Sequence, residues 1–594
     1  MFTRMDALLK KYPFAAAGML VLITGAVYAG SLANGFVYDD DAQVLENAFV
    51  QNPRLWSRIF TGSVWSFWGL HTNFYRPLQF LCYWVMFRLA GPNPAAFHLF
   101  QLLLYAASVV LVYLLGRRLL EDRLVAFLGA LLWAMHPLHV EAVAWISALP
   151  DVAYGFFYLL ALLLFLRAEK AANGRWRGHT LAALAFFGAL LFKEMALSFP
   201  LLLLAYWFFL PTRESRLSRA VHFIPYVLAV GAYVTIRAAA LGYFSLAAYL
   251  GKITPRLVET SLGLLGEHGR LFIWPAELNT FRTFELEPSL RSPWPWLTLF
   301  VVLGTLWVRK REPLLSFLLL WWPVVLLPCL DIRQLSSPLV ADRFSYLPSA
   351  GLCLGISFLL LSRLPQWVPR LRLATLVIPG LVLVMILWGV KTVRTIPNWR
   401  DDEVLTSYSL QQSPHAALLH IAQAQTLQFR YGELDAAARE FETALRLNAA
   451  SHQPLASVIY DAYLGLGVIA QQRGRTAEAL SYYQKAVQVL PRRGPAYDFL
   501  GSFYFPREDY AKAAEYFAQA VHANPYDLGA RFYLGTCWMK LGRHREAVEQ
   551  FRAAREVDPT YWQAYEAEAR ALEALGDPSG AAQVRSLARG EQRR

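Results

Sequence analysis

Long apolar runs alternate with short polar segments from about residue 13 to about residue 390. A helix needs about 20 consecutive apolar residues to cross a bilayer, and several of these runs reach that length. The pattern therefore predicts a bundle of about eleven membrane-spanning helices, with boundaries that are soft by a few residues. The predicted spans are 13–33, 95–116, 124–138, 152–167, 180–192, 195–211, 220–241, 294–308, 313–330, 344–362 and 371–390.

Beyond residue 460 the pattern changes to a repeat with a period of 34 residues. This is the pattern of tetratricopeptide repeats, in which small residues let two helices approach, an aromatic side chain fills the gap and Pro ends the second helix. An earlier unit fits residues 418–449, and a degenerate last unit fits 562–588. The recurring positions are Leu466, Leu500 and Leu534; Gly467, Gly501 and Gly535; Ala479, Ala513 and Ala547; Tyr483, Phe517 and Phe551; Ala486, Ala520 and Ala554; Pro491, Pro525 and Pro559.

These two patterns together predict an all-α fold with two parts. Residues 1–390 are expected to form a polytopic membrane helical bundle, with a first outer loop at 34–94. A linker at 391–415 leads to a tetratricopeptide-repeat α-solenoid at 416–594. The composition agrees, because 56% of the 594 residues are hydrophobic and only 17% are charged. Typical soluble domains have about 45–50% apolar residues, so soluble-only, fibrous and disordered classes are excluded.

The formal net charge is +13, which on its own would suggest nucleic-acid binding. Residues 391–594 are nearly neutral, however, with 24 Lys and Arg against 23 Asp and Glu. The excess therefore lies in the membrane portion, where it gathers in alternate short loops. The positive-inside rule places such loops in the cytoplasm. We interpret the charge as a topology signal and predict no nucleic-acid partner.

The orientation follows from the same rule. Arg4, Lys10 and Lys11 precede the first apolar run, which places the N-terminus in the cytoplasm. Eleven crossings of the inner (plasma) membrane then leave the repeats on the periplasmic or extracytoplasmic side. Residues 255–275 are interpreted as interfacial because they contain Glu259, Glu267, His268 and Arg270. If that segment spanned the membrane, every later element would change sides.

Candidate chemistry begins directly after the first span, at Asp39, Asp40 and Asp41. Three adjacent carboxylates repel one another, which raises at least one pKa unless a cation or metal is near. The alternative is a solvated loop start. The Trp- and Phe-rich segments that follow, at 54–68 and from Arg76 onward, look like amphipathic helices on the membrane surface.

The second outer loop, HPLHVEAVAWISALPD, contains His136, His139 and Glu141. Their spacing could supply metal ligands, although two His three residues apart occur in many helices without a metal. Two further charged residues, Lys193 and Glu194, interrupt a hydrophobic stretch. Charges in such surroundings are costly and usually functional.

Arg343 lies in the last outer loop, where it could hold a lipid-linked phosphate through bidentate, charge-assisted bonds. The predicted topology places all of these residues on one face of the membrane. Acids that face cations there suit transfer of a group from an amphiphilic phosphate donor. A carboxylate would take a proton from an attacking hydroxyl, and cations would stabilise the departing phosphate.

Several motifs then combine in one chain. They are GFVYDDD after the first span, NFYRPL in the first outer loop, HPLHVEAVAWIS in the second, FKEMALSFP, and DRFSYLP before the late spans, with repeats following. Along its whole length the chain resembles the transmembrane and tetratricopeptide-repeat protein O-mannosyltransferases and their bacterial relatives, in the glycosyltransferase C (GT-C) superfamily. The resemblance implies a GT-C-like membrane domain with its active site at the outer leaflet.

The resemblance also implies a reaction. A sugar, with mannose as one candidate, would pass with inversion from a polyprenyl- or dolichyl-phosphate carrier to Ser/Thr hydroxyls of exported proteins. The expected partners are therefore membrane lipid, this lipid-phosphate sugar donor, and an acceptor protein or peptide bound by the repeats. An acidic residue of the first outer loop would act as base or metal ligand, which corresponds to Asp39 or Asp40.

The site residues are assigned on these grounds. The catalytic candidates are Asp40, Asp39 and Glu141, and the candidates for binding donor phosphate or substrate are Arg76, His136, His139, Lys193, Glu194 and Arg343. No cofactor is established beyond the donor. If a divalent metal takes part, its candidate ligands are Asp40, Asp41 and His139.

Two other functions remain open. One is a non-enzymatic membrane scaffold whose repeats assemble an envelope or secretion complex, since such arrays usually bind peptides or proteins. The other is a GT-C enzyme that acts on lipid or glycan. The acidic first loop and the basic outer residues favour an enzyme over a scaffold, and the repeats favour a protein acceptor.

Overall fold

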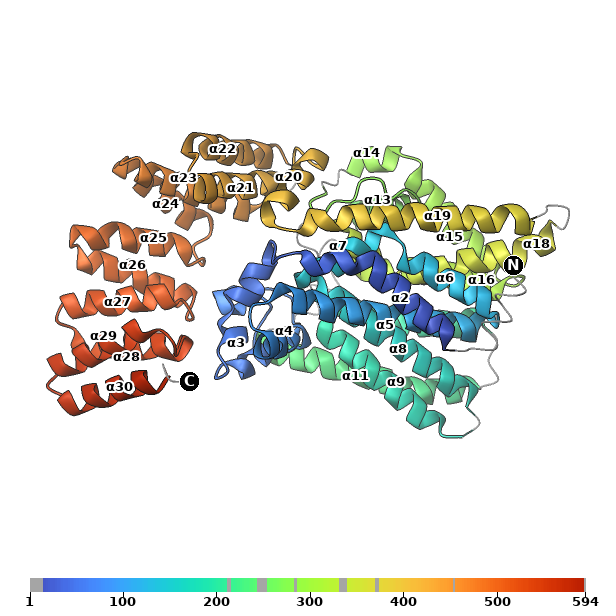
Figure 1. The fold of residues 1–594 in the computed structure, drawn as a ribbon, viewed down its shortest axis with the longest axis horizontal. Helices are drawn as coiled ribbons and strands as arrows, with labels where there is room; N and C mark the ends of the chain where they lie inside the picture. The colour runs from blue at the N-terminus through green and yellow to red at the C-terminus, as the bar shows by residue number, and fades with distance from the viewer. Residues whose placement is uncertain are drawn as a thin grey trace. The chain divides into compact units, whose positions relative to one another are not determined.

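The computed structural model describes residues 14–171, 173–210, 215–242, 254–282, 286–330, 339–368, 373–451 and 454–591. Throughout these residues the regular structure is helical, which confirms the all-α prediction (Figure 1). Arg4, Lys10 and Lys11, on which the predicted orientation depends, lie outside the described residues. By its contacts the chain divides into two compact units. The membrane unit is residues 1–41 and 74–413, and the repeat unit is residues 42–73 and 414–594.

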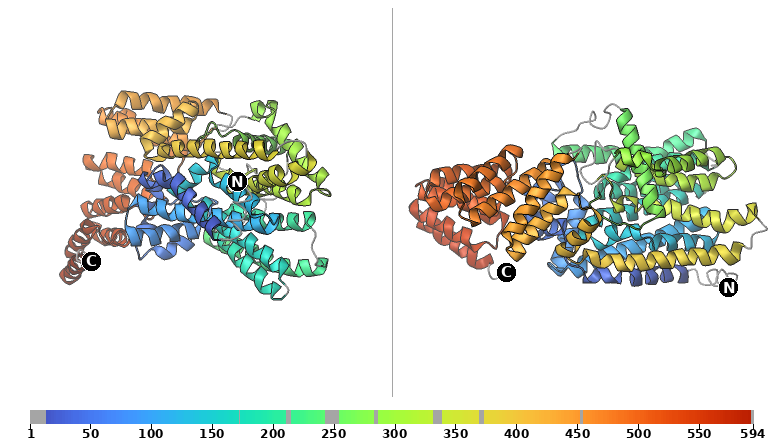
Figure 2. Two further views of the ribbon diagram at one scale, coloured as in Figure 1. Left: turned by 45° about the vertical axis from the view of Figure 1, so that its right-hand side comes forward. Right: turned by 90° about the horizontal axis from the view of Figure 1, so that it is seen from above.

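The membrane unit is a bundle whose longer helices run side by side (Figures 1 and 2). Its α-helices are α2 (Ala15–Tyr28), α4 (Pro77–Ala90), α5 (Pro94–Leu120), α6 (Arg123–Ala134), α7 (Val140–Ala144), α8 (Leu149–Lys170), α9 (Arg175–Phe192), α10 (Phe199–Phe209), α11 (Arg216–Leu241), α13 (Pro255–Ile273), α14 (Leu286–Arg291), α15 (Trp294–Val308), α16 (Pro313–Leu330), α17 (Ser349–Phe358), α18 (Leu364–Trp367), α19 (Leu373–Thr395) and α20 (Asp402–Gln412).

The number of clear spans is smaller than predicted. Among the described helices seven are long and apolar enough to cross a membrane, or eight if α6 and the bent segment after it form one span. Each of the eleven predicted segments contains a helix within its described residues, but three of these helices fall short of a full span. The helices at Glu194–Phe209 and Trp294–Val308 are too short, and α9 carries Arg175, Arg177 and His179 in its first turns. The chain is a multi-pass membrane protein with fewer full-length spans than its apolar runs suggest.

The repeat unit consists of antiparallel helix pairs stacked on one another (Figure 1). Its helices are α3 (Ala48–Gln51), α21 (Ala417–Thr426), α22 (Leu434–Ala450), α23 (Ala456–Gln472), α24 (Thr476–Val489), α25 (Pro495–Tyr504), α26 (Tyr510–Ala523), α27 (Leu528–Lys540), α28 (His544–Val557), α29 (Trp562–Ala574) and α30 (Pro578–Glu591). These pairs confirm the predicted tetratricopeptide repeats, including the early unit and the last one.

The helix pairs close through glycine and aromatic residues at the predicted positions. A Cβ atom on Gly501 would collide with the ring of Phe517, and one on Gly535 would collide with the ring of Phe551. Both rings are buried. Because a side chain at these glycines would push the two helices apart, the Leu-Gly pair and the aromatic residue are required together in each unit.

Residues 42–73 fold with the repeats. The side-chain amide of Asn52 donates hydrogen bonds of 2.9 Å to the carbonyls of Glu556 and Val557, at the C-terminal end of α28. The ring of Phe49 meets Tyr526 edge-on, with centroids 4.8 Å apart. The segment 54–68, expected as an amphipathic surface helix, forms two short 3-10 turns instead. The rings of Trp65, Phe67 and Trp68 in this segment pack on one another. They help to fill the apolar core that residues 42–73 form with the repeats.

The chain therefore passes between the two units three times, at 41–42, 73–74 and 413–414. The first passage directly follows Asp39–Asp41, and the second lies two residues before Arg76. The backbone that carries these predicted site residues is thus continuous with a segment that packs on the repeats.

We expect Asn52→Ala to lower the free energy of unfolding of the repeat unit by about 1–2 kcal/mol, because two carbonyls at the end of α28 lose their donor. Thermal unfolding would measure the stability, and hydrogen exchange of residues 42–73 should become faster. Gln472→Ala, at an exposed position of α23, is the control. Exchange in residues 42–73 that is equal in both variants would contradict this packing.

Candidate active site

The helix α2 is followed by a 3-10 turn (Ala29–Ala33), an irregular stretch and a sharp turn at Tyr38, which directly precedes the aspartate cluster. Tyr38 has a left-handed backbone conformation with φ of 55°, which is rare for a bulky residue and typical of functional sites. Its N–H donates to Oδ1 of Asp402 at 2.6 Å, and the N–H of Gly35 donates to the carbonyl of Arg400 at 2.9 Å. The backbone before the aspartates is therefore held against the segment that follows α19.

Asp40 is fully buried and joins the first and second predicted outer loops. Its Oδ1 accepts a hydrogen bond from the Ser147 N–H at 2.6 Å, and its Oδ2 accepts one from the Val37 N–H at 3.0 Å. Burial raises the pKa of Asp40 to about 8 against the opposing effect of these bonds, and the charge of Asp39 adds to the rise. Both carboxyl oxygens of Asp40 are thus occupied by fixed backbone donors.

Asp39 and Asp41 have different surroundings. Asp39 is half-buried; burial raises its pKa to about 7, and the positive charge of Arg343 lowers it. Burial and the negative charge of Asp402 raise the pKa of Asp41. The three predicted carboxylates are therefore not equivalent, and of the three Asp39 is the one whose pKa responds to Arg343.

Arg343 comes from the 3-10 turn at Asp342–Ser345 and meets Glu141 of α7. Its backbone N–H donates to Oε2 of Glu141 at 2.8 Å, and its guanidinium donates to Oε1 of the same carboxylate. The guanidinium also lies 5.1 Å from the ring centroid of Trp145. Glu141 thus holds Arg343 through both of its oxygens.

Two more cation–carboxylate pairs lie in the same region. Nζ of Lys193 donates to Oδ1 of Asp151 at 2.6 Å, with both side chains nearly buried. Arg76 forms a bidentate pair with Glu194, with distances of 3.2 Å from Nε to Oε2 and 2.6 Å from Nη2 to Oε1. The positive charges of Arg76 and Arg343 both act on Lys193. Residues from distant parts of the sequence therefore form one cluster of paired charges.

The two predicted histidines lie in the protein core instead. His136 is within hydrogen-bond distance of the Phe272 carbonyl through Nε2 (3.1 Å) and accepts from the Leu138 N–H at Nδ1 (3.3 Å). His139 lies 3.0 Å from the Tyr105 hydroxyl through Nδ1 and 3.0 Å from Ser349 Oγ through Nε2. Both rings are fully buried, so all four ring nitrogens have protein partners.

The hydrogen bonds of Asp40 and His139 also bear on whether these residues can bind a metal ion. Among the described residues, no group of three or more His, Cys, Asp or Glu side chains is arranged to hold a metal ion. Asp40 uses both oxygens on backbone N–H groups, and His139 uses both nitrogens. The residues in their present arrangement do not fit a metal, and metal dependence stays an untested prediction.

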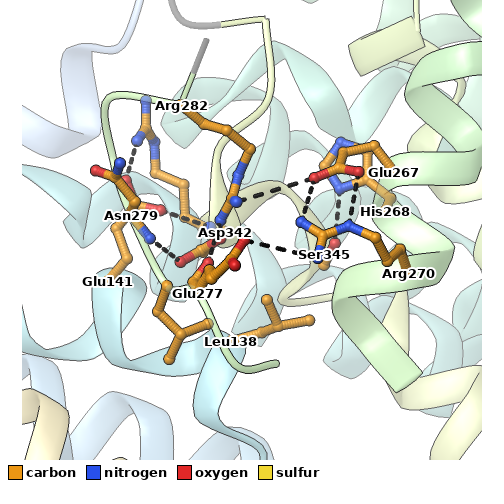
Figure 3. Close-up of polar contacts among 12 residues, drawn as sticks. Leu138, Glu141, Glu267, His268, Arg270, Glu277, Asn279, Arg282, Asp342 and Ser345 are labelled. Atoms are coloured by element: carbon orange, nitrogen blue, oxygen red, sulfur yellow. Dashed lines mark hydrogen bonds and ion pairs between the residues drawn. The ribbon is translucent and has the colours of Figure 1, made fainter. Parts of the chain in front are cut away.

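A polar network next to Glu141 was not assigned from the sequence (Figure 3). Asp342 accepts hydrogen bonds of 3.0 Å from the Asn279 N–H and from Nη2 of Arg282. Burial raises the pKa of Asp342 to about 7, and Arg282 opposes the rise. These bonds hold residues 274–282, which we call the strap, against the last outer loop. The Tyr408 hydroxyl donates to the carbonyl of Leu278 at 2.9 Å and holds the strap from α20.

Asp151 and Asp342 could have been assigned from the sequence, because each is an acid in the same predicted outer loop as a selected residue, Glu141 or Arg343. Arg282 and Asn279 gave no such signal. They follow α13 in a short stretch of mixed polar and apolar residues, and only the fold brings them to Asp342.

The comparisons with known proteins agree with this organisation. Residues 76–239 match a family model described as dolichyl-phosphate-mannose-protein mannosyltransferase. Residues 426–498 and 507–575 match tetratricopeptide-repeat models. The first match starts at Arg76 and includes Glu141, Asp151, Lys193 and Glu194.

Similar proteins carry corresponding names. Protein O-mannosyl-transferase TMTC1 of Homo sapiens is 27% identical over 504 residues, which cover 73% of this chain and 55% of the human protein. Protein O-mannosyl-transferase F38B6.6 of Caenorhabditis elegans is 25% identical over 430 residues, which cover 68% of this chain and 59% of that protein. This chain therefore spans little more than half the length of these relatives.

Two solved structures are also similar to part of this chain. The crystal structure of YrrB, titled a TPR protein with an unusual peptide-binding site, has a TM-score of 0.26 and 24% identity, covering 32% of this chain and 92% of that one. The MamA protein has a TM-score of 0.26 and 20% identity, covering 30% of this chain and 92% of its own. The sequence comparisons confirm the resemblance: this chain is similar to TMTC protein O-mannosyl-transferases, with residues 76–239 matching a mannosyltransferase family model and later residues matching tetratricopeptide-repeat models.

Proposed function

We propose that this chain is a membrane glycosyltransferase that moves a mannosyl group from a polyprenyl-phosphate carrier to Ser or Thr hydroxyls of a protein. The names of its relatives support the reaction class. The observation that carries the proposal is the half-buried Asp39, whose pKa burial raises to about 7 beside the Arg343–Glu141 pair. A carboxyl group with a pKa near the working pH suits general-base catalysis.

In the proposed step, Asp39 accepts the proton of the attacking hydroxyl. The hydroxyl oxygen forms a bond to the anomeric carbon of the sugar while the bond from that carbon to the phosphate oxygen breaks. The phosphate leaves with the electron pair, and the configuration at the anomeric carbon inverts. Asp40 is a positioning residue here, because both of its oxygens are occupied by the N–H groups of Val37 and Ser147.

The cations would stabilise the leaving group of the reaction. Arg343, Lys193 and Arg76 form the positive side of the cluster, and their charges would stabilise negative charge on the departing phosphate. Glu141 accepts two hydrogen bonds from Arg343. We therefore assign Glu141 to positioning Arg343, with Asp39 as the base.

The proposal also includes a location. The basic short loops and the positive-inside rule favour a cytoplasmic N-terminus and an extracytoplasmic site in the inner (plasma) membrane. The acceptor would be an exported protein recruited by the repeats, which typically bind peptides or proteins. In that arrangement the aspartates, the lipid donor and the repeats share one compartment.

We expect Asp39→Asn to lower the rate of sugar transfer by about 10²- to 10⁴-fold, the usual contribution of a general base. Binding of the lipid donor should persist, because the cation pairs remain. Asp41→Asn is the neighbouring control and should retain most of the activity. Transfer assays with lipid-linked mannose and a Ser-containing polypeptide would measure both variants, and near-normal transfer by Asp39→Asn would refute its role as base.

The pH profile offers a separate test. The base must be deprotonated to act, and the pKa of Asp39 is about 7. We therefore expect kcat/KM to rise about tenfold per pH unit below 7 and to level off above it. Arg343 lowers this pKa, so Arg343→Gln should move the profile to higher pH as well as reduce activity. A profile that is flat from pH 5.5 to 8 would contradict this assignment.

A further inference from the structure

A small cavity lies beside Glu141 in the membrane unit. Its walls come from the turn before α7, from the strap, and from the segment running from the end of α19 into α20. Figure 3 shows Asn279 and Arg282 of the strap beside Asp342, and both Asn279 and Asp342 line this cavity. In the present conformation the cavity has room for roughly one water molecule.

Two hydroxyl groups in the lining have no hydrogen-bond partner among the described residues. Thr280 of the strap is 5% exposed and Ser409 of α20 is 1% exposed. Neither side-chain oxygen makes a hydrogen bond within the part of the chain that the structure describes. Buried polar groups are normally paired, so a ligand with hydroxyl groups that entered this cavity would find two unpaired partners there.

The charges of the lining indicate which ligand. Glu141 is neutralised by Arg343, and Asp342 is paired with Arg282 at 3.0 Å. The cavity therefore offers no uncompensated charge for an anion or a cation. Its unpaired groups are neutral hydroxyls, each of which can both donate and accept a hydrogen bond. These groups suit a neutral ligand that itself carries hydroxyl groups.

The cavity lies next to the cation that would hold the phosphate. Its wall includes Trp399, whose ring stacks on Trp145 with centroids 5.7 Å apart and an interplanar angle of 24°. The guanidinium of Arg343 lies 5.1 Å from the centroid of Trp145. Two stacked rings therefore separate the cavity from Arg343 along this path, whereas Glu141 of the lining contacts Arg343 directly.

We propose that this cavity is the subsite for the sugar ring of the lipid-phosphate donor, with Thr280 and Ser409 binding sugar hydroxyls and Trp399 forming an apolar wall. This inference rests on the proposed function. A hexose needs more room than one water molecule, so its entry requires the strap to move outward. The strap is held by Asp342 and Tyr408, and its displacement would open the cavity on that side.

The test removes each hydroxyl without changing side-chain size much. In the full-length protein, Thr280→Val and Ser409→Ala should each raise the donor KM about fivefold, the effect of one lost hydrogen bond. The inhibition constant of sugar-free polyprenyl phosphate should not change, because it occupies only the phosphate site. Thr406→Val is the matched control: it lies on the same helix, is 6% exposed, and does not line the cavity.

A donor KM that changes less than twofold in both variants would overturn the subsite. So would an inhibition constant for polyprenyl phosphate that rises together with the donor KM. If the wild-type protein transfers no sugar from any lipid-phosphate donor, the proposed function is wrong. Equilibrium dialysis with radiolabelled methyl α-mannoside then decides the subsite separately. Saturable binding that is lost when Thr280→Val and Ser409→Ala are combined would support the subsite. Absence of saturable binding to the wild type would overturn it.

Discussion

A charged group withdrawn from water must be compensated, and this constraint organises the candidate site. Burial of an ion without a partner is costly, and loss of one partner of a buried pair is strongly destabilising. Here Lys193 is paired with Asp151, and Arg343 is paired with Glu141. In each pair the two members come from different segments of the chain, so each pair also fixes how two segments meet. The electrostatic surroundings of Asp39 follow from that arrangement.

The fold was largely predictable because two simple periodicities dominate the sequence. Apolar runs predicted helices at all eleven positions, and the 34-residue repeat predicted the helix pairs from Tyr460 onward. Residues 42–73 were harder to interpret. Their Trp and Phe residues indicate an apolar face that must be covered, but they do not say what covers it. The sequence suggested the membrane surface, whereas Phe49 in fact packs against Tyr526.

The candidate site was predictable in part. Lys193 and Glu194 were selected because charge stood out against an apolar background, Arg343 because it lies in the last predicted outer loop, and Arg76 within the NFYRPL motif; all four lie in the paired cluster. His136 and His139 met a similar criterion of residue type and spacing, but a buried imidazole can be satisfied by neighbouring hydroxyl and backbone groups. Arg282 lacked any unusual surroundings in the sequence, since its role depends on the turn after α13. Residue type and spacing identify candidates, and the partners become known only from the fold.

The triple passage of the chain between its units constrains how such a protein can evolve or be engineered. A repeat array joined at one point could be exchanged by a single crossover. In this chain, a single crossover near residue 414 would install foreign repeats while keeping the native residues 42–73, whose Asn52 and Phe49 match the ends of particular helices. A chimaera that preserves this packing must exchange residues 42–73 together with the array. Homologous repeats and the segment inserted after the aspartates should therefore be inherited as one block, although more than 300 residues separate them in the sequence.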